Sequence, residues 1–427
     1  MATFQTVKGF RDFYPEDCAL RNYIFDVWRR VARRYALHEY EAPVVEFTDL
    51  YRKKSGDEIT GQLFCFEDKK GREISLRPEV TPSLARMATA RQRHYGKPMK
   101  WFQIGSCFRY EEPQKGRTRE FNQFNADILG DAAASADAEL IALAIDVMRE
   151  FGMTREDFVI RLSHRRLWSH FLEEIKVDEG PTSTFLQIID RMEKVPVAVT
   201  TDKLATIGIA FDQVKDFMSS ASESHAVFAP LQENLSARGM WEFVKVDPGI
   251  VRGLAYYTGT VFEVFDLKHG LRAVAGGGRY DNLCGLLGGN DLPCTGFAMG
   301  DVVLGEMLKQ TPHAQMAITD YLLKAFALDV QIIVADESVR HHALGAVQAL
   351  RAAGIRTDYS FNPQKVGKQF QVAEDKKARY AVLFGSEYPQ VEVKNLIARS
   401  QKQIGAEDLT SHLLEQLKQP AVGPLIA

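Results

Sequence analysis

The sequence predicts an α+β protein in which a mostly antiparallel sheet with a helical insertion is followed by a small α/β domain. Over roughly the first 280 residues, short segments rich in aromatic and β-branched residues alternate with charged turns, which is typical of antiparallel strands. From residue 329 onward, continuous apolar runs such as "VQIIVAD" alternate with helical patterns such as "SVRHHALGAVQALRAAGI". We therefore expect one domain over residues 1–325 and a second over residues 329–427.

The elements of the first domain follow in order. Apolar side chains recur at helical spacing over residues 18–36, and Pro43 excludes a longer helix, so one amphipathic helix is expected there. Strands are expected at residues 62–66, 73–77, 100–111, 119–129, 259–266 and 271–275. Residues 165–240 or so contain several helix-like runs, which indicate a helical insertion. The stretch "LKQTPHAQMAITDYLLKA" is expected to link the two domains.

Composition excludes several classes of protein. The chain of 427 residues is 45% hydrophobic and 26% charged, which is ordinary for a globular protein, and its net charge of −3 argues against wholesale coating of nucleic acid. The N-terminus has no apolar signal-like run, and no later run approaches the ~20 apolar residues of a membrane span. We therefore expect a cytoplasmic protein with no membrane partner. The five cysteines are widely spaced without a histidine at metal-ligand spacing, so no zinc site is expected.

The first candidate site is the segment "WFQIGSCFRYEEPQKGRTREFNQFNADILG", which reads as two strands joined by a charged loop. Successive side chains of a strand alternate between faces. One face of this pair then collects Arg109, Glu111, Phe121, Gln123, Asn125 and Asp127. A solvated edge hairpin would explain the polar residues, whereas Phe121 beside a guanidinium suits a stacked purine. The loop Gln114 to Arg117 suits phosphate contact and is equally compatible with a solvated turn.

Three further segments place polar or conformationally free residues beside strands. "SLRPEVTPSLARM" has Glu79 and Thr81 at a strand end, where Thr81 could be only the N-cap of the next helix. "AVAGGGRYDNL" has three glycines, which permit either a flexible turn or a close approach within a strand. "VRGLAYYTGTVFEVFD" contains Arg252, which is either a working cation or the polar residue before a buried strand. Rossmann and P-loop glycine motifs do not occur, so those nucleotide sites are disfavoured.

Several motifs together carry a family resemblance. The segments "LRPEVT", "FRYEEPQKGRTREFNQF", "RGLAYYTGTVFE", "AGGGRYDNL", "GFAMG" and "GKQFQVAEDKKARYAVLFG" occur in the order and spacing of bacterial histidyl-tRNA synthetases. The chain resembles this family of class II aminoacyl-tRNA synthetases over nearly its whole length, most weakly across residues 165–240. The resemblance implies a class II catalytic domain followed by an anticodon-binding domain at residues 329–427.

The resemblance also implies an activity and its partners. Members of the family use ATP, with Mg²⁺, to convert L-histidine to histidyl-adenylate and then transfer histidine to tRNA(His) in translation. The helix at residues 18–36 and the segment "EAPVVEF" resemble motif 1, the dimer element of the family, so a homodimer is expected.

Site residues are implied by the same resemblance. Arg109 and Arg252 would bind the substrate carboxylate and the α-phosphate, because two anions must meet there. The expected ATP-binding residues are Arg109, Glu111, Arg117, Phe121 and Arg252. Glu79, Thr81 and Gln123 would hold the amino group of histidine. Asp127 and Tyr257 would read the imidazole, with Tyr256 and Tyr280 completing the pocket. Gln114 and Lys115 would contact the acceptor end of the tRNA.

The chain departs from the family pattern at two positions. The family commonly has aspartate at the position of Ala255 and a motif 3 arginine at the position of Val303. Losing one such transition-state contact typically costs about 3 kcal/mol. Either another cation or Mg²⁺ replaces it, or the chain is a weak or altered synthetase. The sequence offers Arg272, Arg279 and Arg86 as substitutes without choosing between them.

Two competing interpretations are weighed against the synthetase. The first is a non-catalytic paralogue that senses histidine, such as the regulatory subunit of ATP phosphoribosyltransferase. Such subunits lack the C-terminal anticodon-binding domain and tend to lose the catalytic cations, whereas this chain has the domain and retains Arg109, Arg117 and Arg252. The second is a relative that uses another amino acid, but Asp127 and Tyr257 favour imidazole.

Overall fold

The computed structural model describes residues 4–52, 61–177, 182–221, 226–251 and 256–418. The chain divides into two compact units, one ending at Ile318 and the other beginning at Thr319. The predicted domain boundary at residues 325–329 falls a few residues later, and α13 (Pro312–Phe326) spans the division between the units. The stretch predicted as a linker is therefore largely helical.

The first unit is built on a mixed sheet of eight strands among its described residues. In spatial order these are β1 (His38–Glu39), β5 (Met99–Phe108), β6 (Glu120–Leu129), β11 (Cys294–Gly300), β10 (Ala275–Arg279), β9 (Thr260–Asp266), β7 (Phe158–His164) and β8 (Val244–Val246). Neighbouring strands run antiparallel except at the two edges, where β1 pairs with β5 and β8 with β7 in parallel. The predicted antiparallel sheet is therefore confirmed for the six central strands.

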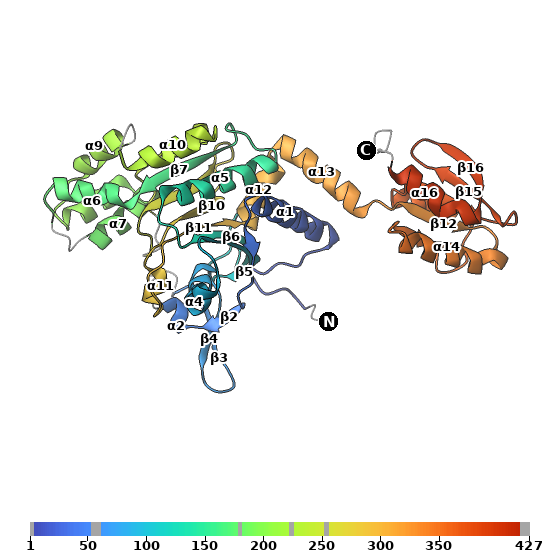
Figure 1. Ribbon diagram of the computed structural model, residues 1–427, viewed down its shortest axis with the longest axis horizontal. Coiled ribbons are helices and arrows are strands. Elements are labelled where there is room, and N and C mark those ends of the chain that lie inside the picture. The colour runs from blue at the N-terminus through green and yellow to red at the C-terminus, as the bar shows by residue number, and fades with distance from the viewer. Residues whose placement is uncertain (1–3, 53–60, 178–181, 222–225, 252–255, 419–427) are drawn as a thin grey trace. The chain divides into compact units, whose positions relative to one another are not determined.

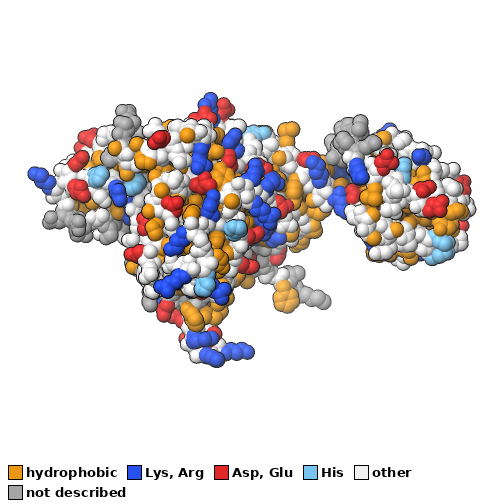
Figure 2. Space-filling view, viewed as in Figure 1, with side chains coloured by type: hydrophobic (Ala, Val, Ile, Leu, Met, Phe, Trp, Pro, Cys, Tyr) orange, Lys and Arg blue, Asp and Glu red, His pale blue; other side chains and the backbone are white. Residues whose placement is uncertain are grey.

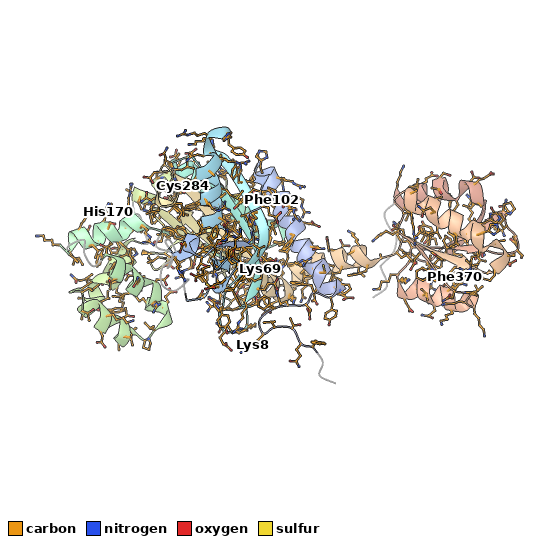
Figure 3. All side chains as sticks on the ribbon, turned by 90° about the horizontal axis from the view of Figure 1, so that it is seen from below. Lys8, Lys69, Phe102, His170, Cys284 and Phe370 are labelled. Atoms are coloured by element: carbon orange, nitrogen blue, oxygen red, sulfur yellow. The ribbon has the colours of Figure 1, made fainter. Side chains whose placement is uncertain are left out.

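Helices cover one face of this sheet (Figure 1). They are α1 (Pro15–Arg34), α5 (Ala134–Glu150) and α12 (Asp301–Gln310). Phe124 points to this face and stacks on Trp28 of α1, with ring centroids 5.7 Å apart. Figure 3 labels Phe102 within the same sheet, where its ring packs against Phe124. Helix α1 begins three residues before the predicted range because Pro15 suits a first helical turn.

A smaller sheet and three helices adjoin the large sheet. The smaller sheet has the antiparallel order β2 (Val45–Phe47), β4 (Glu73–Leu76) and β3 (Phe64–Glu67). After it come α4 (Thr81–Arg91) and, much later in the chain, α11 (Leu283–Leu286), which contact each other. The four-residue helix α2 (Asp49–Arg52) follows β2. The β4–α4 connection sets the position of Glu79.

The helical insertion packs around its own core. It comprises α6 (Arg165–Glu174), α7 (Thr182–Arg191), α8 (Val197–Ala205), α9 (Phe211–Ala221) and α10 (Ala229–Ala237). Trp168, Phe171 and Phe185 meet at ring-centroid distances of 5.2–5.8 Å in this core. Figure 3 labels His170 on the insertion, apart from the sheet. Helix α10 returns to contact α5, so the insertion is anchored on the helical face.

The second unit is a small α/β domain with a five-stranded sheet. Its strand order is β13 (Thr357–Tyr359), β12 (Val330–Val334), β14 (Tyr380–Phe384), β15 (Gln390–Asn395) and β16 (Ser400–Gly405). Its helices are α14 (Arg340–Ala352), α15 (Val366–Asp375) and α16 (Leu409–Lys418). The two apolar runs predicted as strands are β12 and β14, which pair in parallel and bury their side chains. The predicted alternation of strands and helices in an α/β domain is therefore confirmed.

Short 3₁₀ helices complete the two units. They are η1 (Gln92–His94), η2 (Met192–Lys194), η3 (Ala226–Phe228), η4 (Trp241–Phe243), η5 (Glu337–Val339) and η6 (Ala406–Asp408).

Across the described parts of the chain, no helix has both the length and the apolar character that crossing a membrane requires.

One predicted strand is misplaced. Residues 271–275 were expected to form a strand, but β10 begins at Ala275 and runs through three glycines to Arg279. Glycine has a low strand propensity, so the strand predicted from the sequence stopped where the glycines begin. Tertiary packing overrides that preference here, because β10 is enclosed between β9 and β11.

Candidate active site

A pocket of about 260 Å³ opens on the first unit, lined by the β5–β6 hairpin, the strand ends around it and the start of α4. It collects ten of the residues singled out in the sequence: Glu79, Thr81, Arg109, Glu111, Arg117, Phe121, Gln123, Tyr256, Tyr257 and Tyr280. The outermost of these residues, Glu79 and Tyr280, are 201 positions apart in the sequence. Bringing them together requires the pairing of β6 with β11 and of β11 with β10.

The remaining predicted residues have other positions. Asp127 does not line the pocket but hydrogen-bonds to Tyr280, which does. Lys115 lines an adjacent cavity, and Gln114 lies in the loop, where its backbone pairs with that of Arg117 at N–O distances of 3.0 and 2.8 Å. Arg252 and Ala255 lie outside the described residues.

The β5–β6 hairpin positions Arg109 over Phe121. Phe121 pairs with Cys107 in the ladder, and the Arg109 amide donates to the Arg119 carbonyl at 2.9 Å, which closes the base of the loop. The Arg109 guanidinium carbon lies 5.3 Å from the Phe121 ring centroid, in cation–π contact. Its Nε donates to the Pro78 carbonyl at 3.1 Å. The ring and the guanidinium predicted to flank a purine are therefore in direct contact in this structure.

The loop of the hairpin brings a second guanidinium into the pocket. Arg117 Nε lies 2.5 Å from Glu111 Oε2, so these two predicted ATP contacts form an ion pair. Gly116, between Lys115 and Arg117, has φ of +75°, a conformation that side-chain-bearing residues rarely adopt. The tight turn at Gly116 allows Arg117 to point back toward Glu111.

Glu79 and Thr81 enter the pocket from the β4–α4 connection. Glu79 is buried and accepts a 2.9 Å hydrogen bond from the Tyr256 hydroxyl. Thr81 is itself the first residue of α4, and Val80 occupies the N-cap position without a side-chain hydrogen bond. The alternative that Thr81 serves only as an N-cap is therefore wrong.

Asp127 is a buried carboxyl beside the pocket, and its pKa is raised above the ordinary value. It accepts a 2.6 Å hydrogen bond from the Tyr280 hydroxyl, while its Oδ2 has no hydrogen-bond partner among the described residues. Burial raises the pKa of Asp127 to about 7, against the smaller lowering effect of the Tyr280 hydrogen bond. A buried carboxylate oxygen without a partner is suited to accept an N–H from a ligand.

Glycines create the space in which these groups meet. Gly296 lies opposite Asp127 in the ladder, and a Cβ there would be 1.8 Å from Asp127 Oδ1. A Cβ at Gly277 would be 2.2 Å from the Gly296 carbonyl oxygen, and one at Gly278 would be 2.4 Å from the Thr260 carbonyl oxygen. Of the two interpretations of the glycine run, close approach within a strand is confirmed.

Some pocket residues received no role from the sequence. Asn125 lies on the predicted face of β6, and its Nδ2 has no hydrogen-bond partner among the described residues. Glu263 lines the pocket from β9, where it is the one charged residue inside the apolar run "TVFEVF". That isolated charge was the available signal for Glu263. Gly276 and Val303 also line the pocket.

The pocket carboxylates are the candidate ligands for a metal ion. Within the described ranges, no group of three or more His, Cys, Asp or Glu side chains is arranged to hold a metal ion. Glu111 and Glu263 line the pocket as carboxylates, the ligand type that Mg²⁺ takes together with substrate phosphates. Their chemistry fits a magnesium ion that arrives with a nucleotide.

Comparisons with known proteins cover both units. A family model described as histidyl-tRNA synthetase matches residues 9–301, and one described as an anticodon binding domain matches residues 329–416. The chain is 43% identical to the histidine–tRNA ligase of Opitutus terrae, over 93% of each chain. It is 37% identical to the chloroplastic/mitochondrial histidine–tRNA ligase of Arabidopsis thaliana, over 94% of this chain and 85% of that one.

Solved structures give the same fold. The histidyl-tRNA synthetase of Nostoc sp. superposes with a TM-score of 0.77 at 23% identity, covering 97% of this chain and all of that one. An ATP phosphoribosyltransferase regulatory subunit/histidyl-tRNA synthetase from Bacillus halodurans superposes with a TM-score of 0.69 at 21% identity, covering 87% and 97%. At these identities the likeness concerns the fold alone.

Proposed function

The chain belongs to the histidyl-tRNA synthetase family, where it acts as a histidine–tRNA ligase, and from this premise we propose that the pocket of the first unit binds histidine and ATP together. The observation that carries the proposal is the meeting in one pocket of two guanidiniums, Arg109 and Arg117, with the buried acceptor Glu79. Neutral hydrophobic ligands would leave these groups unpaired, which is costly in a buried site. A zwitterionic amino acid and a polyphosphate satisfy both signs of charge.

The first half-reaction forms histidyl-adenylate. A carboxylate oxygen of histidine attacks the α-phosphorus of ATP, a new P–O bond forms, and the bond to the bridging oxygen of pyrophosphate breaks. Two anions approach each other, so positive charge placed beforehand lowers the barrier. We assign this role to Arg109 and to Arg252, the latter on the resemblance alone because it lies outside the described residues. Arg117 and Glu111 are proposed to contact ATP, and Phe121 to stack on its adenine.

The histidine substrate is proposed to bind between two hydrogen-bonded pairs. Glu79, held by the Tyr256 hydroxyl, would accept from the ammonium group, with Thr81 and Gln123 as further partners. Asp127, held by the Tyr280 hydroxyl, would accept from an imidazole N–H through its Oδ2, and Tyr257 would contact the ring. Polar groups arranged in this way select against amino acids that lack matching donors, because the buried groups would be left unpaired.

Mg²⁺ is proposed to enter with ATP. When bound, it supplies charge neutralisation between the phosphates of the nucleotide. Glu111 and Glu263 are the pocket carboxylates available to hold it. We propose that these residues keep the ion on the phosphate side of the pocket.

The second half-reaction requires tRNA. A ribose hydroxyl of the 3′-terminal adenosine attacks the carbonyl carbon of histidyl-adenylate, and AMP leaves. We propose that the tRNA is tRNA(His), that the second unit binds its anticodon, and that Gln114 and Lys115 contact its acceptor end. Support for the last assignment comes from the cavity beside Lys115, which is lined by further cations, Arg21 and Lys309 among them, as well as by carboxylates. These cations suit a phosphate backbone. The proposed location is the cytoplasm.

A homodimer is proposed through the region that resembles motif 1. The supporting observation is an apolar face on the smaller sheet. Phe47, Ile74 and Phe66 are directly opposite one another across β2, β4 and β3, so their side chains share a face. Phe47 and Phe66 remain 53% and 44% exposed. Neighbouring apolar side chains on a solvent-facing sheet are typical of an interaction surface. Strands β3 and β4 form a hairpin, and Figure 2 shows basic side chains gathered at its tip.

Histidine-dependent exchange of pyrophosphate into ATP by the purified protein tests the proposal. We expect exchange with histidine and none with other amino acids. Tight histidine binding without exchange would favour the histidine-sensing paralogue, and exchange with a different amino acid would reassign the substrate. Arg252→Ala is expected to abolish exchange without lowering the melting temperature. Near-wild-type exchange by this variant would show that Arg252 has no part in catalysis.

A further inference from the structure

Arg272 is a pocket residue whose guanidinium has no hydrogen-bond or ion-pair partner in the part of the chain that the structure describes. It lies between β9 and β10 and lines the pocket together with Arg109, Arg117 and Val303. Its side chain is partly exposed to solvent, and none of the hydrogen bonds or ion pairs among the described residues involves it. An arginine that lines a pocket without a carboxylate partner is available to an anionic ligand.

The charges around Arg272 favour an anion there. Partial burial, followed by the positive charges of Arg117 and Arg109, lowers the pKa of the Arg272 guanidinium, whereas Glu111 and Glu263 act in the opposite direction. Glu111 already forms an ion pair with Arg117 at 2.5 Å. The positive charge of Arg272 is therefore disfavoured in the ligand-free pocket, and a polyphosphate would relieve that penalty.

The two other arginines considered as substitutes are occupied elsewhere. Arg279 is buried, and its guanidinium pairs with Asp137 at 3.1 Å and Asp281 at 3.2 Å. Arg86 pairs with Glu46 at 2.6 Å. Neither of them lines the pocket. Of the three candidates, Arg272 alone is both in the pocket and without an ion-pair partner among the described residues.

Val303 lies on the same pocket and offers no charge. A Cβ placed on Gly116 would be 3.6 Å from Val303 Cγ2, so the valine packs beside the turn that carries Arg117. This is the position where the family resemblance leads one to expect an arginine. The loop before β10 supplies a guanidinium to the same cavity from a different element.

We propose that Arg272 binds the triphosphate of ATP during histidine activation and supplies the guanidinium that is missing at Val303. The proposal rests on the proposed function and names one further ATP-binding residue for it. Arg109 and Arg117 would then act with Arg272 as three guanidiniums around one polyphosphate. Bidentate contact between guanidinium and phosphate oxygens is the interaction expected.

Arg272→Ala in the full chain tests the proposal. We expect kcat/KM for ATP in histidine-dependent exchange to fall about 100-fold, as for removal of one donor that stabilises a transition state. The KM for pyrophosphate should rise with that for ATP, because both ligands carry the contacted phosphates. The KM for histidine should stay within about twofold of wild type, since Glu79 and Asp127 are held by the Tyr256 and Tyr280 hydroxyls and not by Arg272. Arg272→Lys should retain part of the activity, as a point charge without the planar fork.

A second substitution separates position from general charge. The double variant Arg272→Ala/Val303→Arg should have a kcat/KM for ATP at least about tenfold higher than Arg272→Ala alone, because Val303→Arg places a guanidinium on the same cavity. Arg91→Ala, at the exposed end of α4 and outside the pocket, is the matched control and should leave exchange unchanged. Thermal unfolding of each variant verifies that it is folded.

The outcomes are distinguishable. Exchange by folded Arg272→Ala within about threefold of wild type would overturn the inference. An equal rise in the KM values for histidine and for ATP would also overturn it. Failure of Val303→Arg to restore any activity would also count against a shared phosphate site. Wild-type protein without histidine-dependent exchange would overturn the proposed function, and this inference would fall with it.

Discussion

The Tyr280 hydroxyl donates a 2.6 Å hydrogen bond to Asp127 Oδ1, and both side chains are 2% exposed. Burial outweighs this hydrogen bond and raises the pKa of Asp127 to about 7. The Asp127 carboxyl, next to the ligand-free pocket, is therefore protonated in acid and becomes an anion near neutral pH. A ligand N–H donated to Oδ2 would favour the anion, so substrate binding and deprotonation of Asp127 are linked.

The first prediction concerns the stability of Asp127→Asn across pH. In the unfolded chain the Asp127 carboxyl loses its proton near its ordinary value of 3.8, but in the folded chain only near 7. Between these values the folded state binds more protons, so wild-type stability falls as pH rises through this window. Asparagine has no proton to lose. The melting temperature of Asp127→Asn minus that of wild type should therefore increase from about pH 4 to about pH 7 and level off above, as measured by thermal unfolding.

Tyr280→Phe provides the matched comparison. Its missing hydroxyl removes the hydrogen bond that lowers the pKa of Asp127, so the stability of this variant should fall over a window that extends to higher pH. A difference in melting temperature between Asp127→Asn and wild type that is flat across pH would contradict the assignment of this titration to Asp127.

The second prediction separates the two faces of β6 by replacing one phenylalanine on each. Phe121→Leu should raise the KM for ATP about tenfold, because base–aromatic stacking is worth about 1–3 kcal/mol. Phe124→Leu should lower the melting temperature without changing that KM, since Phe124 is buried against Trp28 on the helical face. Pyrophosphate exchange at varied ATP measures the KM of both variants, and thermal unfolding measures their melting temperatures. Equal KM values for Phe121→Leu and wild type would show that adenine does not stack on Phe121.

The third prediction concerns close packing of the glycine strand. Gly277→Ala should destabilise the first unit by about 1–3 kcal/mol, because its Cβ would meet the Gly296 carbonyl oxygen at 2.2 Å and Phe297 Cα at 2.6 Å. Gly96→Ala is the control, with no atom within 4 Å of its added Cβ. Urea unfolding of both variants gives the comparison. A Gly277→Ala protein as stable as Gly96→Ala would show that β10 can move away from β11.

Much of the site could be predicted because its core is local in sequence. The β5–β6 hairpin is two strands joined by a short loop, and period-two alternation alone places Phe121 and Gln123 on one face and Phe124 on the other. The helix α1 was equally accessible, since its apolar residues repeat at helical spacing. These patterns depend on neighbours in the chain and need no knowledge of the fold.

The remainder depends on contacts between distant segments. Gly276 to Gly278 oppose strand formation by propensity, and only the enclosure of β10 between β9 and β11 makes glycine necessary at Gly277 and Gly278. The parallel pairing of β1 with β5 joins segments about 60 residues apart and has no local signal. The sequence named Arg272 as one of three candidate cations but could not choose it, because its place in the pocket is set by where the loop before β10 returns to the sheet.

The fourth prediction concerns assembly through the smaller sheet. Phe47→Asp should raise the dimer dissociation constant at least about 100-fold, because it places a carboxylate among the apolar side chains that Phe47 shares with Ile74 and Phe66. Val197→Asp is a matched control, since Val197 is 60% exposed in the helical insertion and an aspartate at the start of α8 is compatible with the helix dipole. Sedimentation velocity at micromolar concentration should show a dimer for wild type and Val197→Asp, and a monomer for Phe47→Asp.

A wild-type monomer would contradict the homodimer. A dimer that survives Phe47→Asp would move the interface away from this face, because an unpaired carboxylate buried at a contact costs several times the thermal energy.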